Sequence, residues 1–186
     1  MALIFDEYDA ARPELMFVLQ RILENDGKFT LIDQNQVITP NPYFRMFATT
    51  NTIGLGDSTG LYHGSHVINQ GQMDRWNIVA TLNYLPLEKE IAIVRANSPQ
   101  LDQEVIKNMI ELASLIRKGF MVGDISCVMS PRAVINWAKN MLIFKCLETS
   151  FRLSFLNKCD EAEKPILAEY YQRIFDHAIK ESIIAN

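Results

Sequence analysis

The stretch Ala2-Leu3-Ile4-Phe5-Asp6-Glu7 decides the fold that we expect for this chain. Four apolar residues run without a polar break into two adjacent carboxylates, which predicts a short β-strand, buried on both faces, that ends at Asp6. In open α/β sheets, ligands bind outside the carboxyl ends of the strands. The acidic pair therefore stands where chemistry is expected, although an Asp at a strand end also serves to cap the turn that follows it.

The next segments predict a helix and a hairpin. Apolar residues recur at three- and four-residue spacing from Pro13 to Leu23, which predicts an amphipathic helix that Gly27 closes. Two short β-type runs, residues 29–32 and 37–39, flank four turn-prone residues, so we expect a β-hairpin there.

A second strand is predicted over residues 43–50. It ends on Thr49 and Thr50, with Asn51 directly after them. Like Asp6 and Glu7, these polar residues follow the carboxyl end of a strand. We therefore expect two strands to deliver polar groups to one edge of the sheet.

Residues 52–71 contain five of the eight glycines and lack apolar periodicity, which is typical of a functional loop. The spacing Gly54-x-Gly56-x-x-x-Gly60 superficially resembles a phosphate loop. No Gly-Lys-Ser/Thr follows it, and Asp57 would repel phosphate, so we favour a different role for this loop. An apolar run follows at residues 78–82.

Helical signals predominate from residue 86 onward. We expect helices over residues 87–94, from Ser98-Pro99 through Ile116 to Gly119, from Ser130-Pro131 through Met141, and after Asp160. The sequence therefore divides near residue 85 into an α/β part and a helical part.

Composition excludes several classes of protein. Charged residues make up 22% of the chain and the net charge is −4, which argues against a dedicated nucleic-acid binder. Cys127, Cys146 and Cys159 lie far apart, so neither a zinc site nor a disulfide framework is indicated. We recognise no membrane span and no signal peptide, and we expect a cytoplasmic protein.

Four separated motifs resemble, in order, the Walker B, sensor 1, arginine-finger and sensor 2 elements of AAA+ ATPases of the MoxR and chelatase group. They are Leu3-Ile4-Phe5-Asp6-Glu7, Phe47-Ala48-Thr49-Thr50-Asn51, Met73-Asp74-Arg75-Trp76 and Met129-Ser130-Pro131-Arg132. Residues 54–64, 69–76 and 155–160 are further similar to the CobS family, the ATPase subunits of aerobic cobaltochelatase. The likeness runs along nearly the whole chain.

The resemblance implies an α/β fold in two domains. Residues 1–85 would be the C-terminal half of a AAA+ P-loop ATPase core, a parallel sheet with flanking helices. Residues 86–186 would be an all-helical lid domain. The run at residues 78–82 would be the strand after the arginine finger.

The resemblance also implies a role for each site residue, with ATP and Mg²⁺ as cofactors. Asp6 would bind the Mg²⁺, Glu7 would activate the attacking water, and Asn51 would hold that water or the γ-phosphate. Arg132 would reach the same phosphates from the lid, and Arg75 would face the nucleotide of the next subunit. Taken from the residues alone, an Arg75 paired with a nearby acid and a solvated Arg132 remain alternatives.

The implied function is ATP hydrolysis by a homo-oligomeric, hexameric ring. In the family this hydrolysis drives insertion of cobalt into a corrin precursor, in cobalamin biosynthesis, by companion chelatase subunits of the CobT-like and CobN-like kinds. Neither nucleic acid nor a membrane is an implied partner. Two alternatives stay open: a MoxR-type ATPase that remodels another protein complex, and a non-catalytic assembly module that supplies Arg75 in trans.

The sequence departs from the family at one motif. It contains no G-x-x-x-x-G-K-Ser/Thr, because Gly27-Lys28 has Ile22 in place of the first glycine and Phe29 in place of the hydroxyl residue. In the family, the strand that feeds this loop lies between the strands expected at residues 43–50 and 78–82. We therefore expect the chain to be the C-terminal part of a longer ATPase, with two strand edges unpaired and weak nucleotide binding on its own.

Overall fold

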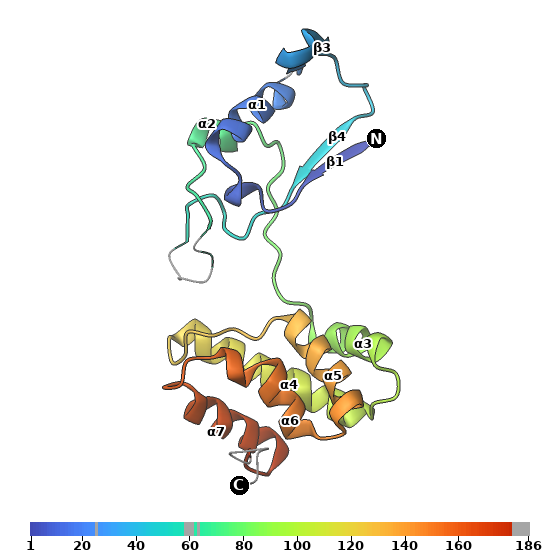
Figure 1. Ribbon diagram of the computed structural model, residues 1–186, viewed down its shortest axis with the longest axis vertical. Coiled ribbons are helices and arrows are strands. Elements are labelled where there is room, and N and C mark those ends of the chain that lie inside the picture. Colours follow the sequence, from blue (N-terminus) through green and yellow to red (C-terminus); the bar gives the residue numbers. More distant parts are fainter. Residues whose placement is uncertain (25, 58–61, 63, 180–186) are drawn as a thin grey trace. The chain divides into compact units, whose positions relative to one another are not determined.

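The computed structural model describes residues 1–24, 26–57, 62 and 64–179, without the side chain of residue 32 (Figure 1). The chain divides into two compact units, Met1–Asn83 and Tyr84–Asn186. The first unit is mixed helix and sheet, and the second is helical. Residues 58–61 and 63, which belong to the Gly-rich loop expected from the sequence, lie outside the described residues.

A small parallel sheet organises the first unit. Strand β1 (Ala2–Phe5) pairs with β4 (Arg45–Ala48) in a register that sets Ala2 opposite Arg45 and Phe5 opposite Ala48. Figure 1 shows the two strands side by side. The carboxyl ends of both strands therefore meet at one edge, as the sequence predicted.

The expected burial of β1 on both faces is wrong for this chain. Ile4 is 65% exposed and Phe47, its partner on β4, is 54% exposed. A sheet of two strands has too few neighbours to cover these side chains. A continuous apolar run such as β1 is typical of a strand that is covered on both faces. The described residues leave β1 largely uncovered.

The helix and hairpin predicted after β1 are confirmed. A 3₁₀ turn η1 (Tyr8–Ala10) leads into α1 (Pro13–Leu23), in which Pro13 takes the first helical position. Strand β2 (Phe29–Leu31) pairs antiparallel with β3 (Gln36–Ile38) across the 3₁₀ turn η2 (Ile32–Gln34).

The strand expected at residues 78–82 is wrong for this chain. These residues follow the short helix α2 (Gln70–Met73) and form neither a helix nor a strand. Ile78 is 86% exposed and Leu82 is 92% exposed. A strand needs a neighbour to bond to, and none of the described residues provides one here.

The core of the first unit lies where η1 meets α1. Tyr8, Met16 and Ile68 are buried, and Phe5, Leu19 and Trp76 are among the residues that pack against them. The rings of Tyr8 and Trp76 meet edge to face with their centroids 5.5 Å apart. This cluster links the end of β1 to the segment that carries Arg75.

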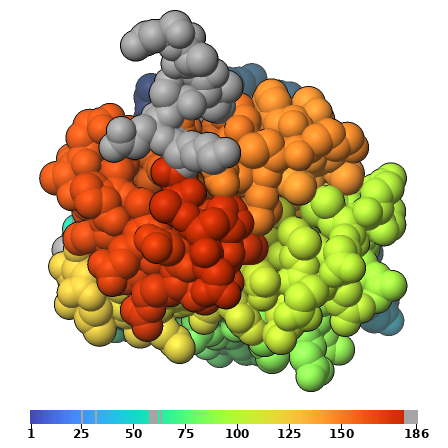
Figure 2. All heavy atoms as spheres, turned by 90° about the horizontal axis from the view of Figure 1, so that it is seen from below, coloured from blue at the N-terminus to red at the C-terminus, as the bar shows by residue number. Residues whose placement is uncertain are grey.

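The second unit is built from five α-helices in its described residues. They are α3 (Leu87–Asn97), α4 (Gln103–Val122), α5 (Pro131–Phe144), α6 (Leu147–Ser154) and α7 (Lys164–Phe175), with the 3₁₀ turn η3 (Leu156–Lys158) before α7. Trp137, Phe151 and Tyr171 are fully buried and stack together in the core. Figure 2 shows this unit from the side of α7 (red), with part of α4 (green) beside it.

The boundaries expected for the second of these helices are wrong at both ends. Its N-cap is Asp102, whose Oδ1 accepts a hydrogen bond from the Glu104 amide at 2.7 Å, whereas Ser98 is buried. Its C-cap is Gly123, with φ of 83°. Gly119 lies within the helix and leaves room for Tyr170: a Cβ at Gly119 would lie 2.8 Å from the Tyr170 hydroxyl.

Among the described residues, no helix combines the length and the apolar character needed to span a membrane.

Candidate functional site

Thr49 joins the two strand ends that carry the acidic pair. Its amide donates to the Phe5 carbonyl at 2.8 Å, and its own carbonyl accepts from the Tyr8 amide at 2.8 Å. Its hydroxyl accepts from the Glu7 amide at 3.1 Å and donates to Asp6 Oδ1. The Asp6 carboxylate and the Glu7 backbone are therefore held at the sheet edge, and both residues are exposed.

Glu7 has an unusual backbone conformation. Its φ of 53° and ψ of 48° lie in the left-handed region, which disfavours residues with a side chain. Residues in such conformations persist where their surroundings enforce them, and they cluster at functional sites. Here the bonds from the Glu7 and Tyr8 amides to Thr49 enforce it.

The segment after β4 is organised by Asp9. The carboxylate of Asp9 accepts from the Asn51 amide at 3.1 Å and from the Thr52 amide and hydroxyl at 3.0 Å each. Thr52 Oγ1 in turn accepts from the Gly54 amide at 3.2 Å. Asn51 is thus fixed at the same sheet edge as Asp6 and Glu7, with its own side chain exposed.

Asp9 is buried but remains ionised more readily than an ordinary aspartate. Burial by itself raises the pKa of Asp9, whereas hydrogen bonds from Thr52, Asn51 and Ser65 lower it, and the net pKa is below its usual value. A buried carboxylate with this many donors carries a stable negative charge beneath the site.

A cavity of about 320 Å³ lies beside the end of β4. Its lining residues are Tyr8, Ala48, Thr49, Thr50, Asn51, Thr52, Ile53, Gly54, Ile68, Met73, Trp76, Ile78, Val79, Ala80, Thr81 and Leu82. It therefore lies between the carboxyl end of β4 and residues 78–82, and Asn51 borders it.

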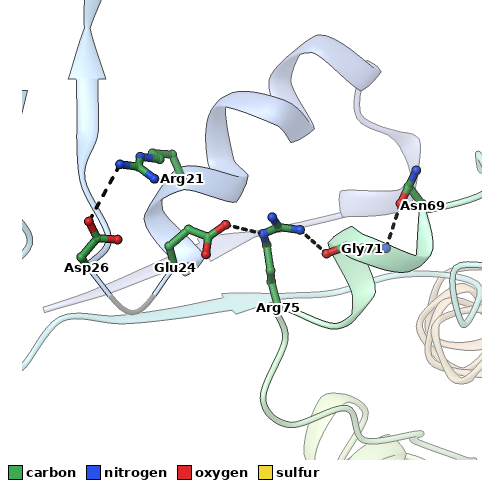
Figure 3. A network of polar contacts seen from close by, with 6 residues as sticks. All are labelled: Arg21, Glu24, Asp26, Asn69, Gly71 and Arg75. Carbon is green, nitrogen blue, oxygen red and sulfur yellow. Dashed lines mark hydrogen bonds and ion pairs between the residues drawn. The ribbon is translucent and has the colours of Figure 1, made fainter.

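Arg75 lies in the first unit and is paired within the chain. Its Nε donates to Glu24 Oε1 at 2.7 Å, and its Nη1 donates to the Gly71 carbonyl (Figure 3). The Arg75 side chain is 33% exposed. Arg75 is thus paired with an acid of its own chain, Glu24, which is one of the alternatives that the sequence left open.

Arg132 belongs to the second unit, at the second position of α5. Ser130 caps this helix, because its Oγ accepts from the Ala133 amide at 3.2 Å. Just before the cap, the Met129 carbonyl accepts from Nε of the buried Arg117 at 2.8 Å. The exposed Arg132 therefore projects from a firmly anchored helix start.

Comparison with known proteins agrees with these motifs. The family described as CbbQ/NirQ/NorQ C-terminal matches residues 90–163. The chain is 56% identical, over 97% of its length, to the aerobic cobaltochelatase subunit CobS of a Sinorhizobium species, and covers 56% of that protein. These findings identify a CobS-like AAA+ protein of the MoxR group.

More distant similarity extends to two midasins. The identity is 26% with midasin of Giardia intestinalis, over 61% of this chain and 2% of that protein. It is 29% with midasin of Dictyostelium discoideum, over 39% of this chain and 1% of that protein. The CobS-like chain thus spans about half the length of its Sinorhizobium relative and a small fraction of the midasins.

Sequence reasoning missed three residues that shape this site in the CobS-like chain. The sequence predicts Thr49 only as a polar residue at a strand end. It gives no role to Asp9, and it does not identify Glu24 as the partner of Arg75. Asp9 accepts from the Asn51 amide 42 positions away, and the Thr49 hydroxyl donates to Asp6 across 43 positions. Glu24 pairs with Arg75 across 51 positions. No local pattern announces such contacts, although a second Asp two residues after Glu7 was a visible signal.

The oxygen ligands at the sheet edge suit a Mg²⁺ that is shared with phosphates and water. They do not suit a metal ion ligated entirely by protein side chains. Within the described residues, no group of three or more His, Cys, Asp or Glu residues is placed to hold a metal ion. Mg²⁺ in nucleotide sites is held by one or two carboxylates together with phosphates and water. The exposed carboxylate of Asp6 fits that requirement.

Proposed function

We propose that this chain supplies the metal-binding and water-activating half of an ATP site in a AAA+ ATPase. The observation that carries the proposal is the parallel pairing of β1 with β4, which sets Asp6 and Glu7 beside the segment that holds Asn51. Oxygen and amide groups gathered at the carboxyl edge of a parallel sheet are suited to a Mg²⁺-nucleotide and its attacking water.

Each residue at this edge has a distinct task. Asp6 would hold Mg²⁺, which when bound neutralises charge on the phosphates. Glu7, on its enforced backbone, would orient a water and take its proton. Asn51 would form a hydrogen bond with that water or donate one from Nδ2 to the γ-phosphate. Asp9 fixes the Asn51 backbone, from which this side chain extends.

The phosphate-binding half of the site would come from residues outside these 186. No Gly-x-x-x-x-Gly-Lys-Ser/Thr occurs in the 186 residues. Among the described residues β4 pairs only with β1, and a cavity lies between the carboxyl end of β4 and residues 78–82. We assign the unpaired side of β4 to a further strand. Such a strand would end beside Asn51, where a phosphate loop is needed.

The remaining arginines would act on the same nucleotide from other directions. We assign Arg132 to a helical lid domain, where its guanidinium fork suits phosphate oxygens. We assign Arg75 to the nucleotide of a neighbouring copy in a homo-oligomeric ring. Arginine fingers of this kind contribute about a thousandfold or more in rate.

For the complete protein we propose the role of a CobS-type subunit. It would couple ATP hydrolysis to insertion of cobalt into a corrin precursor by companion subunits of the CobT-like and CobN-like kinds. The support is the 56% identity to a protein named as an aerobic cobaltochelatase subunit. Cobalt is the cargo of the partner complex, and we assign no cobalt ligand here.

A second candidate is a non-catalytic assembly module that contributes Arg75 in trans. It would need only the Arg75 side chain, which Glu24 and Gly71 hold and which is 33% exposed. The two candidates differ in whether Glu7 matters to turnover.

Substitution of Glu7 by Gln tests the leading proposal. In the ATPase completed with a phosphate-binding loop, we expect Glu7→Gln to keep ATP affinity within about twofold and to lower kcat by at least about a hundredfold. Amide and carboxylate have the same shape, so folding is preserved. Unchanged turnover in Glu7→Gln would remove Glu7 from catalysis and favour the assembly module.

A further inference from the structure

The guanidinium of Arg75 is held on two sides by its own chain. Its Nε donates to Glu24 Oε1 at 2.7 Å, and its Nη1 donates to the carbonyl of Gly71 (Figure 3). Glu24 directly follows α1, whereas Gly71 lies in α2. Two elements that are far apart in sequence therefore fix the orientation of one planar group.

These contacts leave part of the guanidinium available. The group carries five N–H donors, one on Nε and two on each Nη. Among the described residues, Nη2 donates to no partner, and Figure 3 shows this nitrogen joined to none of the residues drawn. The side chain is 33% exposed, and Nη2 is not among the fully buried polar atoms that lack a partner in the described residues, so another molecule can reach that edge.

The ion pair between Arg75 and Glu24 contributes little to stability. Pairs that are about one-third exposed gain modest energy and are screened by salt. What the pair does supply is orientation, because a fixed donor fork spends less entropy when it meets an anion.

We propose that Glu24 is a positioning residue for Arg75. It holds Nε so that Nη2 and the second N–H of Nη1 face outward, towards a phosphate of ATP bound to a neighbouring copy of this chain. This inference rests on the proposed function, and it adds Glu24 as the group that prepares Arg75 for that role.

The first test asks whether Glu24 fixes Arg75 in the chain itself. In the ¹H–¹⁵N NMR spectrum, we expect the Arg75 Nε–H signal to be shifted downfield and slow to exchange with water. Glu24→Ala should abolish this protection, and Glu24→Gln should keep part of it because the amide oxygen still accepts. Asp26→Asn is the matched control: it changes one charge two residues away, in an exposed pair with Arg21 at 3.9 Å.

The second test measures ATP hydrolysis in the assembly completed with a phosphate-binding loop. We expect Glu24→Ala to lower kcat about tenfold with KM for ATP unchanged, since positioning acts on the transition state. Glu24→Gln should recover most of the loss, and Asp26→Asn should match the wild type. In an Arg75→Ala background, Glu24→Ala should have no further effect.

Each outcome separates the inference from the proposed function. If Arg75→Ala does not lower kcat, or the wild-type assembly shows no turnover, the proposed function fails, and the NMR signal still reports whether Glu24 fixes Arg75. If Arg75→Ala lowers kcat but Glu24→Ala does not, or raises it, the positioning role is wrong. An equal loss with and without Arg75 would assign Glu24 a purely structural role.

Discussion

At the scale of single residues, Asp9 is the hidden support of the site. Its buried carboxylate collects the amides of Asn51 and Thr52 and the Thr52 hydroxyl, so it fixes the backbone on which Asn51 stands. Asp9 contacts no nucleotide in our proposal. Its effect on chemistry passes through the loop that it holds.

Substitution of Asp9 by Asn should destabilise the first unit by about 2 kcal/mol at neutral pH, because the new NH₂ group faces backbone donors instead of accepting from them. The measurement is a urea titration followed by the NMR amide signals of residues 49–54. Asp33→Asn, at an exposed position in η2, is the control and should cost little. Equal stability of the two variants would contradict the supporting role of Asp9.

The pH dependence of this stability follows from the depressed pKa of Asp9. A carboxylate with a lower pKa in the folded state stabilises that state above the unfolded pKa of about 4, and the contribution is lost as pH falls through the folded pKa. In the same titration, we therefore expect Asp9→Asn to flatten the loss of stability below about pH 4.

At the scale of elements, a buried ion pair anchors the start of the helix that carries Arg132. Arg117 on α4 pairs with Glu90 on α3 at 2.9 Å, and both side chains are buried. The Arg117 Nε also donates to the Met129 carbonyl, and its guanidinium lies 3.9 Å from the centre of the Tyr84 ring. Three segments of the second unit are thus tied together by one side chain.

Substitution of Arg117 by Met should cost about 3–5 kcal/mol, because it leaves Glu90 buried without its cation. Adding Glu90→Leu should recover much of that loss. The free energy of unfolding is read from urea denaturation followed by circular dichroism. The matched control is Lys107→Met on the surface of α4, where pairs with Glu104 and Glu111 are exposed. A loss at Arg117 no larger than at Lys107 would contradict the anchoring role.

Element boundaries show where sequence reasoning reaches its limit. The spacing in residues 13–23 predicted α1, and Ser130-Pro131 predicted the start of α5, because capping and periodicity are local. Gly119 was expected to end a helix, yet it serves close packing against Tyr170. That contact joins α4 to α7 and has no signature in the sequence around Gly119.

The same limit applies to the candidate site. The paired strand ends were predictable, since apolar runs that close on polar residues identify the carboxyl edge of a sheet. The partners that fix those residues come from long-range contacts, such as Thr49 with Asp6 or Glu24 with Arg75. The strand expected at residues 78–82 needs a neighbour that the described residues do not supply.

At the scale of the whole molecule, the two units differ in how completely they enclose apolar groups. The second unit buries a continuous core that includes Trp137, Phe151 and Tyr171. The first unit buries Tyr8, Met16 and Ile68 as its apolar core and leaves the side chains of Ile78 and Leu82 almost fully exposed. Exposed apolar groups beside a free strand edge are typical of a surface that another segment covers.

The most direct test of the central claim is ATP turnover after this chain is mixed with a polypeptide that carries the Gly-Lys-Ser/Thr loop of a CobS relative. We predict turnover well above that of either component, and its loss when the chain carries Glu7→Gln. Complex formation is verified separately by sedimentation. A stable complex with no turnover above background would contradict the claim that Asp6, Glu7 and Asn51 form the metal and water half of an ATP site.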